Sequence, residues 1–482
     1  MKRLVLTLFF AAALRAQPAP VSLAITPGPA VEGATSAAVI VISQTDATLT
    51  GVDFDIELTT FANATLAGPF SPKQSCTNID AKHLRCRLSE LLPGSRSTFL
   101  VTITPREGRY TLTAHTQSVT AFPYSFLIRR QIVVTNTRDA GEGSLRAAIE
   151  AANAIGTNTQ VPIEIRFAID EPPVGKAFVI RPLTQLPPIT ASDIRIAAAV
   201  DMFADRVELD GTLAAGGSGL ELRGEGPFEI DGLIIGGFPW DGISVRRAGK
   251  PEIAPSRIAS VSVGLHRDGT PNPNRSRGIT LDAPTSDLLI FASFINANMR
   301  SGLFVAGAAR IDLYSSFMDD NGASGVFVGP GSRDVLIRLN RFARNAHFGV
   351  AIARGASRVR VTKFFAEGNG NLVIDHGLDG FSGYAFNGFH PPAPFIESAV
   401  FDPLTGTTTI RGTFDAPDPT IAWKITLYAP YRVTDYGDRP ETIVSGNRFT
   451  MILPGPVASP MQLLADPVEP SDWSTSEFSN AL

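Results

Sequence analysis

The chain has 482 residues, of which 44% are apolar and only 18% are charged, with 43 glycines and 36 prolines. This length exceeds what one compact core holds, so several domains are expected, and the composition excludes a disordered chain. The formal net charge of −4 gives no general reason to expect nucleic acid as a partner.

Residues 1–16 are predicted to be a secretory signal peptide. Lys2 and Arg3 precede an apolar run from Leu4 to Leu14, and Ala16 offers a cleavage point. A membrane anchor is the rival interpretation, but eleven apolar residues are too few to cross a bilayer comfortably. We therefore expect a secreted protein, in the extracellular space or at the cell surface, with no transmembrane segment once the signal is removed.

Residues 21–130 alternate apolar and polar residues in short runs, which predicts an antiparallel β-sandwich. The segment Cys86-Arg-Leu-Ser-Glu-Leu-Leu-Pro-Gly resembles the repeat of bacterial extracellular Ig-like modules, in which a Leu-x-Pro-Gly turn precedes a strand. The resemblance implies a spacer or binding module without chemistry of its own. Cys76 and Cys86 are the only cysteines, and in an exported chain they are predicted to form one disulfide.

A short helix is predicted over residues 144–154, because Leu145, Ile149 and Ala152 follow helical spacing after the N-cap Ser144. Such a helix can cover the apolar end of a solenoid. The string from Asp139 to Asn153, which reads Asp-Ala-Gly-Glu-Gly-Ser-Leu-Arg-Ala-Ala-Ile-Glu-Ala-Ala-Asn, resembles the opening motif of secreted bacterial right-handed β-helix repeat proteins of pectin-lyase-like fold. The resemblance implies a right-handed parallel β-helix.

From Gly278 onward the sequence repeats itself about every 24 residues, which is the mark of a solenoid. Each unit holds three short strands and no helix, as one turn of a parallel β-helix does. The resemblance implies that the coil starts before this repeat, so a parallel β-helix of about ten rungs is predicted over residues 131–385. The fold class is therefore all-β, with a second β-sandwich predicted over residues 390–482. Repeated glycines are expected to supply positive φ at the corners, and repeated asparagines to stack their amides as a ladder. These residues are Gly278, Gly302, Gly325, Gly349, and Asn298, Asn321, Asn345, Asn369.

Asp319, Asp320 and Glu367 are the candidate catalytic residues. Hydrolysis of a polysaccharide needs two carboxylates, and β-elimination needs a base beside a neutralising cation. An Asp pair followed by Asp375-His376-Gly377 resembles the polygalacturonase family, but the separation of 55 residues departs from that family's pattern. Solvated acids at turns are the structural alternative.

A cluster of cations between residues 333 and 363 faces a single acid, Asp334, in that window. Arginine binds carboxylate or sulfate with two parallel hydrogen bonds, so the cluster predicts an anionic glycan as ligand. The alternative is a set of rim charges whose stems cover apolar surface. The predicted ligand-binding residues are Arg338, Arg341, Arg344, Arg358, Arg360 and Lys363.

Asp375 and Asp379 are a candidate Ca²⁺ site, with a plain turn as the alternative, and no other cofactor is expected. His266, His347 and His390 look isolated, and nothing marks them as metal ligands. The leading hypothesis is a secreted β-helix scaffold that binds carbohydrate, in particular an anionic glycan, or another extracellular surface. The alternatives are a polysaccharide lyase or glycoside hydrolase acting in a groove along the coil, and an adhesin or cell-surface structural protein.

Overall fold

The computed structural model is almost entirely β-structure and divides into two compact units, residues 1–130 and residues 131–482. The predicted signal peptide lies outside the described part of the chain. The described residues are 20–27, 35–60, 64–67, 73–105, 108–156, 161–174, 176–198, 206–246, 255–378, 393–416, 420–428, 441–444, 446–457, 462–468 and 475–476.

The first unit consists of two antiparallel sheets that enclose one apolar core. One sheet has the order β1 (Val21–Pro27), β2 (Thr35–Ser43), β7 (Arg96–Pro105), β4 (Ala64–Ala67). The other has the order β5 (Gln74–Asp80), β6 (His83–Leu91), β3 (Leu49–Thr60), β8 (Gly108–His115), β9 (Tyr124–Ile128). Cys76 and Cys86 face each other on β5 and β6 and form a disulfide, with their Cα atoms 4.0 Å apart.

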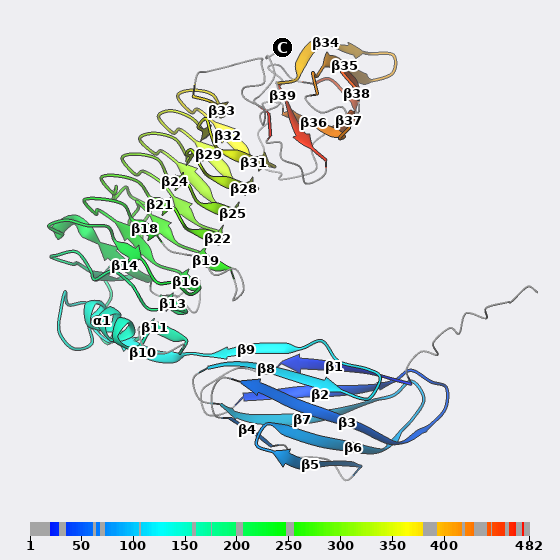
Figure 1. Cartoon of the computed structure of the whole chain (residues 1–482). Coiled ribbons are helices and arrows are strands. Elements are labelled where there is room, and N and C mark those ends of the chain that lie inside the picture. Colours follow the sequence, from blue (N-terminus) through cyan, green and yellow to red (C-terminus); the bar gives the residue numbers. More distant parts are fainter. Residues whose placement is uncertain are drawn as a thin grey trace, which may run out of the picture. The chain divides into compact units, whose positions relative to one another are not determined.

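The second unit begins with a coil whose three walls are sheets of nine, eight and seven strands (Figure 1). The nine-stranded sheet contains β10 (Arg130–Val134), β11 (Ile163–Phe167), β13 (Ile194–Ala197), β16 (Phe228–Asp231), β19 (Ser256–Ala259), β22 (Ser286–Phe291), β25 (Ala309–Tyr314), β28 (Arg333–Arg338) and β31 (Ser357–Thr362). The eight-stranded sheet contains β12 (Ala177–Ile180), β14 (Arg206–Asp210), β17 (Ile234–Gly236), β20 (Ser262–Val263), β23 (Phe294–Ile295), β26 (Phe317–Asp319), β29 (Arg341–Ala343) and β32 (Phe365–Glu367). The seven-stranded sheet contains β15 (Leu220–Leu222), β18 (Ile243–Arg246), β21 (Ile279–Asp282), β24 (Leu303–Ala306), β27 (Val326–Val328), β30 (Val350–Ile352) and β33 (Ile374–His376). Strands of successive turns pair in parallel, which makes the coil a parallel β-helix, as predicted.

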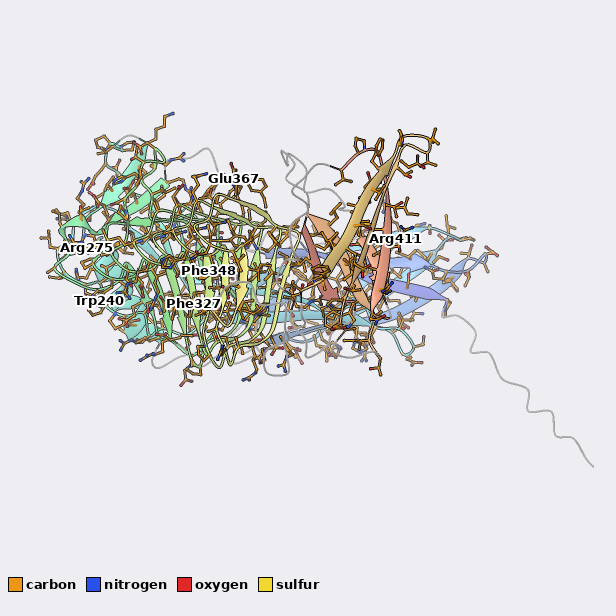
Figure 2. All side chains as sticks on the ribbon, turned by 90° about the horizontal axis from the view of Figure 1, so that it is seen from above. Trp240, Arg275, Phe327, Phe348, Glu367 and Arg411 are labelled. Carbon is orange, nitrogen blue, oxygen red and sulfur yellow. A yellow bond between two sulfur atoms is a disulfide. The ribbon has the colours of Figure 1, made fainter. Side chains whose placement is uncertain are left out.

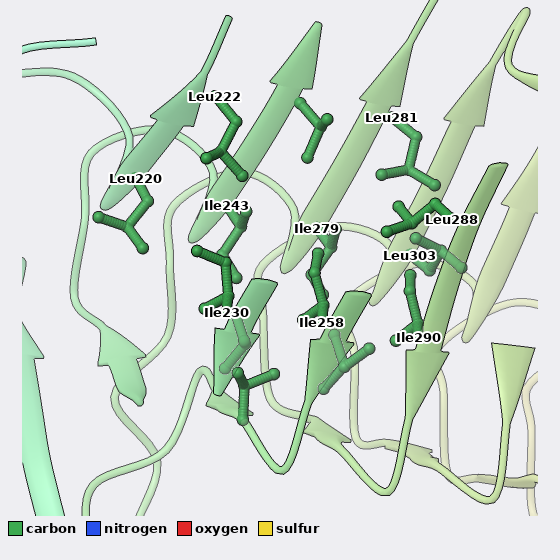
Figure 3. Close-up of a cluster of buried hydrophobic side chains, with 14 of the residues drawn as sticks. Leu220, Leu222, Ile230, Ile243, Ile258, Ile279, Leu281, Leu288, Ile290 and Leu303 are labelled. Atoms are coloured by element: carbon green, nitrogen blue, oxygen red, sulfur yellow. The ribbon is translucent and has the colours of Figure 1, made fainter. Parts of the chain in front are cut away.

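The core of the coil is built from columns of equivalent aliphatic side chains. Ile243, Ile279 and Leu303 stand in register on successive strands of the seven-stranded sheet, and all three are fully buried (Figure 3). Ile258 and Ile290 form a matching column on the nine-stranded sheet. Because each fully buried aliphatic contributes roughly 1.5–3 kcal/mol, these columns dominate the stability of the coil.

The repeated asparagines stack up the coil, as the period predicted. Asn298 donates from Nδ2 to Asn321 Oδ1 at 3.1 Å, Asn321 to Asn345 at 3.0 Å, and Asn345 to Asn369 at 2.9 Å. Asn274 extends the ladder by one rung, since its Nδ2 lies 2.9 Å from Asn298 Oδ1. The ladder satisfies buried polar groups from one rung to the next.

The repeated glycines have a different role from the one predicted. The glycines with positive φ in the described residues do not include Gly302 or Gly325, and the left-handed corners are taken by other residues, such as Asp287 (φ 57°) and Ser315 (φ 50°). A Cβ atom on Gly302 would lie 2.8 Å from the carbonyl oxygen of Gly325, and one on Gly325 would lie 2.8 Å from that of Gly349. These glycines are therefore required because successive rungs approach too closely for a side chain.

Both ends of the apolar core are covered. Helix α1 (Leu145–Gly156), close to the predicted span, lies at the N-terminal end of the coil (Figure 1), and its Leu145 and Ile149 belong to the same core. At the other end, Leu464 of β39 (Gln462–Pro467) joins this core and is fully buried. Covering both ends removes apolar surface that a bare solenoid exposes to water.

The C-terminal segment forms two three-stranded antiparallel sheets around a separate core. One has the order β34 (Phe395–Asp402), β35 (Thr407–Thr413), β38 (Arg448–Pro454), and the other β37 (Glu441–Val444), β36 (Trp423–Tyr428), β39. Within the described part of the chain, no helix has the length and hydrophobicity to cross a membrane.

Candidate functional site

The six cations that were predicted to bind an anionic ligand do not form a free cluster. Arg338 donates from Nε and Nη2 to Asp312 at 3.1 and 2.8 Å. Arg344 donates in the same way to Asp320 at 2.8 and 2.6 Å. Both forks are therefore occupied by a carboxylate from the preceding rung.

Two other members of the set also pair with acids. Arg341 Nη1 lies 2.8 Å from Asp319, and Arg358 Nη2 lies 2.7 Å from Asp334. The remaining two differ from these four. Arg360 donates to the carbonyl of Pro467 in the C-terminal domain at 3.1 Å, and Lys363 is exposed at a corner with φ of 47°. Four of the six cations are thus held in ion pairs that tie rungs together, and a role of the set in binding an anionic ligand stays a prediction.

One corner of the coil shows why the Arg–Asp ion pairs between rungs could not be predicted from neighbouring residues in the sequence. Asp287, Arg310, Asp334 and Arg358 occupy equivalent positive-φ positions on four rungs and alternate in charge. Arg310 bonds Asp287 at 2.6 and 2.7 Å, and the hydrogen bond from Arg358 lowers the pKa of Asp334. Each partner stands 23 or 24 residues away, outside any short window of sequence.

The three candidate catalytic acids lie at the C-terminal ends of strands of the eight-stranded sheet, or directly after them. Asp319 ends β26 and Glu367 ends β32, with Ala343 of β29 between them in register. Asp319 is 4% exposed, accepts a hydrogen bond from Ala343 N at 3.0 Å and forms an ion pair with Arg341 Nη1 at 2.8 Å. Burial raises the pKa of Asp319 despite the opposing effect of Arg341.

These acids are not brought together as the free pair that hydrolysis needs. Asp319 is neutralised by Arg341, and Asp320 is held in two hydrogen bonds by Arg344. Glu367 is exposed one rung beyond Arg344, whose main-chain N donates to the Glu367 carbonyl at 2.8 Å. The arrangement holds adjacent rungs together, and a catalytic role of the three acids stays a prediction.

The candidate Ca²⁺ site is only partly described. Asp375 is buried and its Oδ1 accepts a hydrogen bond from Leu378 N at 3.0 Å, as in a plain turn, while Asp379 lies outside the described residues. Across the described segments, no group of three or more His, Cys, Asp or Glu side chains is placed to hold a metal ion. Calcium binding at this turn stays a prediction.

His266 looks isolated in the sequence but is not isolated in the fold. Its Nδ1 lies 2.5 Å from Oε1 of Glu208, a residue of β14 that is 4% exposed. The second oxygen of Glu208 accepts from the main-chain N of Arg267 at 3.2 Å. The pair anchors the loop after β20 to the eight-stranded sheet, and the separation of 58 residues gives no signal in the sequence.

A second charged surface, which we call the aromatic–arginine strip, lies on the outer face of the seven-stranded sheet and the turn before it. Figure 2 labels four of its members, Trp240, Arg275, Phe327 and Phe348. Sequence reasoning did not select it. The strip consists of Trp240, Arg275, Arg277, Arg300, Phe304, Phe327 and Phe348.

The centre of the strip is a stack of flat groups. Phe304 and Phe327 occupy equivalent positions on β24 and β27, and their rings stack with centroids 5.0 Å apart and planes 10° from parallel. The guanidinium carbon of Arg277, which belongs to the preceding rung, lies over the Phe304 ring, 3.6 Å from its centroid. Such contact holds the arginine side chain in place by cation–π attraction.

Small residues take the strand position at both ends of this stack. Thr280 on β21 and Ala351 on β30 stand in register with Phe304 and Phe327, yet they are only 3% and 1% exposed. At both of these rungs the large side chain comes from the turn three residues earlier, Arg277 in one case and Phe348 in the other. The flat groups therefore extend over four successive rungs.

The arginines of the strip lack acidic partners. Among the residues that the structure describes, no carboxylate bonds to the guanidinium group of Arg275, Arg277 or Arg300, although Asp241 accepts from the main-chain N of Arg277 at 3.0 Å. Trp240, at one end, is 58% exposed. The strip combines one exposed and three half-buried aromatic side chains with arginines whose guanidinium groups bond no carboxylate in the described structure.

Comparison with known proteins places the coil in a defined class. A family model described as "Right handed beta helix region" matches residues 218–383. This segment is a right-handed β-helix. No curated protein matches the chain in sequence.

Several solved structures are similar at low identity. The periplasmic alginate epimerase AlgG matches with 12% identity and a TM-score of 0.25, over 47% of this chain and 47% of its own. The A-module of the Azotobacter vinelandii mannuronan C-5 epimerase AlgE4 matches with 13% identity and a TM-score of 0.26, over 52% of this chain and 98% of its own. The catalytic domain of a GH87 α-1,3-glucanase variant in complex with nigerose matches with 10% identity and a TM-score of 0.19, over 74% and 93%. The chain thus spans about half the length of AlgG.

Proposed function

We propose that the β-helix binds an extended anionic polysaccharide along the aromatic–arginine strip. The observation that carries the proposal is the stacked pair Phe304 and Phe327, continued by the guanidinium group of Arg277 at 3.6 Å. A row of flat apolar groups on the outer face of a sheet suits the flat face of a sugar ring. The C–H groups of a sugar ring carry partial positive charge and lie favourably against the negative face of an aromatic ring.

The direction of the strip suits a linear ligand. Successive rungs are separated by about 4.8 Å, the spacing of neighbouring strands, so the rings form a regular row along the coil. A polysaccharide laid parallel to the coil can therefore meet one flat group after another. Trp240 is exposed and lies in the same column of turn residues as Arg300, two rungs before it. Its ring offers a further flat surface on which a sugar can stack.

Charge supports an anionic ligand in preference to a neutral one. Arg275, Arg277 and Arg300 lie beside the rings without a bonded carboxylate in the described structure, whereas arginines elsewhere on the coil, such as Arg344, are paired with acids. A guanidinium fork matches the geometry of a carboxylate. The formal charge of the whole chain is −4, so this local excess of positive charge stands out against an acidic background.

Export from the cytoplasm is part of the proposal. The disulfide between Cys76 and Cys86 supports it, because such bonds persist in oxidising compartments. An extracellular polysaccharide is a ligand available there. The Ig-like character of the first sandwich remains a prediction.

The lyase or hydrolase alternative has less support. Asp319 and Asp320 are bonded to arginines, so they lack the open arrangement that acid–base catalysis on a glycan requires. Incubation with uronic-acid polysaccharides, following unsaturated products and reducing ends together, tests this alternative. If the Asp319→Asn variant still turns over the polysaccharide and variants with strip residues replaced by alanine do not, catalysis and binding both take place at the strip.

The binding proposal is tested by affinity electrophoresis of the full chain in gels that contain a polyuronate or a neutral glucan. We expect Phe304→Ala with Phe327→Ala to weaken retention about tenfold, because each ring contact contributes roughly 0.5–1.5 kcal/mol beyond its buried area. The matched control is Phe294→Ala with Phe317→Ala, a pair stacked at 4.9 Å on the eight-stranded sheet. Equal loss in both double variants, or no loss in either, contradicts the proposal.

A further inference from the structure

The C-terminal domain meets the last turn of the coil through a two-residue segment, Thr475 and Ser476. Thr475 N donates to the Val359 carbonyl of β31 at 3.0 Å, and Thr475 Oγ1 accepts from Val361 N at 2.9 Å. On its other side, Ser476 N donates to the carbonyl of Ala465 on β39 at 2.9 Å, and Ala465 N donates to Ser476 Oγ at 2.9 Å. The segment therefore joins the open edge of the nine-stranded sheet to β39.

Asp466 lies at the centre of this junction and is 2% exposed. Thr475 Oγ1, which accepts the bond from Val361, donates its own proton to Asp466 Oδ1. A chain of hydrogen bonds thus runs from β31 through Thr475 to the carboxyl group. Leu464, two residues earlier on β39, closes the apolar core of the coil. One short stretch of β39 therefore supplies both the apolar plug and the buried acid.

From the coil, two charged or titratable side chains face the junction. Arg360 of β31 donates from Nη2 to the Pro467 carbonyl at 3.1 Å, and its Nε is buried without a hydrogen-bond partner in the described structure. His376 of β33 bonds the Thr475 carbonyl through Nε2 at 2.7 Å. Arg360 acts on Asp466 through its charge, without a hydrogen bond between the two side chains in the described structure.

From within the C-terminal domain, Lys424 of β36 stands opposite Asp466 in register. Its Nζ lies 3.4 Å from Glu441 of β37, so its charge is shared with another acid. Neither Arg360 nor Lys424 is bonded to Asp466 in the described structure, and the one side-chain bond that Asp466 receives comes from the neutral hydroxyl of Thr475. An ionised Asp466 is therefore compensated only in part.

A buried carboxyl group without a bonded cation is stable when neutral and costly when charged. Burial accordingly raises the pKa of Asp466 to about 6, against the lowering by the Thr475 hydrogen bond and by Arg360. Separation of the domain from the coil exposes Asp466 to water, where its ordinary value of 3.8 returns. Because the docked value is the higher one, docking is fully favoured below 3.8 and loses free energy as the pH rises through about 6.

We propose that Asp466, Thr475 and Arg360 form an acid-closed latch between the C-terminal domain and the end of the β-helix. With a neutral Asp466 the domain is held tightly and the core stays covered. With an ionised Asp466 the segment Thr475–Ser476 is released more often and Leu464 leaves the end of the coil. The latch is independent of the aromatic–arginine strip and of the polysaccharide that the strip is proposed to bind.

Amide hydrogen exchange of the full chain at about pH 5 and about pH 8 tests the latch, with rates corrected for intrinsic exchange. The reporter is the amide of Val361, which is bonded to Thr475 Oγ1. We expect its protection to fall about tenfold across this range, because the exposed Asp466 is already ionised at pH 5 and only the titration of the docked group, at about 6, lies within the range. In Asp466→Asn, which cannot ionise, protection should be equal at both pH values.

Glu397→Gln is the matched control, because Glu397 is an exposed acid of the same domain on β34. It should keep the full pH dependence of the wild type. Wild-type protection that does not change with pH, or an equal change in Asp466→Asn, overturns the latch. If Asp466→Asn does not fold, His376→Gln takes its place, because His376 is the other titratable group bonded to the segment. A pH dependence that persists in this variant supports the latch, and one that disappears refutes it.

Discussion

Two arginine-rich regions of the coil look alike in composition and differ in chemistry. Between residues 333 and 363 four arginines pair with carboxylates of the preceding rung, as Arg344 does with Asp320 at 2.6 Å. In the aromatic–arginine strip, Arg277 instead lies flat on Phe304 at 3.6 Å, with no acid bonded to its guanidinium in the described structure. In a solenoid, the charge of a surface must therefore be counted across rungs, because neighbours in space stand about 24 residues apart in sequence.

The largest effect is expected where a paired acid is buried. Asp319→Ala leaves Arg341 without its partner at a site where Asp319 is only 4% exposed, so the free energy of unfolding should fall by about 3 kcal/mol. Urea denaturation measures this loss. Asp320→Ala, at a position whose side chain is 48% exposed, should cost less than about 1 kcal/mol. Equal costs for the two variants would break the distinction between the buried and the exposed pair.

Removal of the unpaired cations should affect binding and spare stability. Arg277→Ala with Arg300→Ala is expected to weaken polyuronate binding by about 2 kcal/mol, roughly thirtyfold, because hydrogen bonds between charged groups are lost. Isothermal titration calorimetry at low and high salt measures this change, and the salt dependence should shrink with it. Arg338→Ala with Arg344→Ala is the matched control and should bind as the wild type does. A larger loss of affinity in the control would indicate that the ligand binds at residues 333–363 and not at the strip.

The corner ladder should contribute a smaller amount. Arg358→Ala removes the partner of Asp334 from a pair whose side chains are 35% and 33% exposed, so solvent screening keeps the loss below about 1 kcal/mol. Thermal unfolding detects this as a shift of a few degrees at most. A loss comparable to that of Asp319→Ala would show that the ladder acts as one cooperative network.

The smallest predicted effect is the loss of thermal stability at acidic pH. Hydrogen bonds from Arg310 and Arg358 lower the pKa values of Asp287 and Asp334 below 3.8 in the folded chain. Their contribution to stability is therefore complete above 3.8 and is lost as the pH falls through the lowered values. Thermal unfolding of the wild type between about pH 5 and about pH 2 should show this loss, and Arg310→Ala with Arg358→Ala should show less of it. An identical acid response in both proteins contradicts the assignment.

The period of the sequence predicted the coil because residues of one column repeat. Asn298, Asn321 and Asn345 are the same residue at the same position, so their stacking could be read before the structure was known. The reason for the glycine repeat could not be read, since glycine at a positive φ and glycine at a close approach leave the same pattern. Only the spacing of the rungs distinguishes them, because a Cβ atom on Gly325 would lie 2.8 Å from the Gly349 oxygen.

The aromatic–arginine strip escaped the sequence for a related reason. Phe304 and Phe327 belong to strands, whereas Arg277 and Phe348 belong to the preceding turn, so the row of flat groups follows no single period. The Arg–Asp pairs were missed because a window of about thirty residues contains one rung and little of the next. Glu208 and His266, 58 residues apart, lie beyond even the regular repeat because a loop extends that turn.

The close approach at the repeated glycines has a consequence for how such a chain can change in length. Gly325 and Gly349 each present their carbonyl oxygen to the glycine of the preceding rung, and each asparagine of the ladder donates its side-chain amide to the asparagine of the next rung. A duplicated unit of about 24 residues would meet identical partners above and below, so the coil can be lengthened or shortened by whole turns. An insertion of any other size inside a strand would misalign every column that follows. Such insertions are tolerated only in the loops, as between β20 and β21, where the chain departs from the wall before rejoining it.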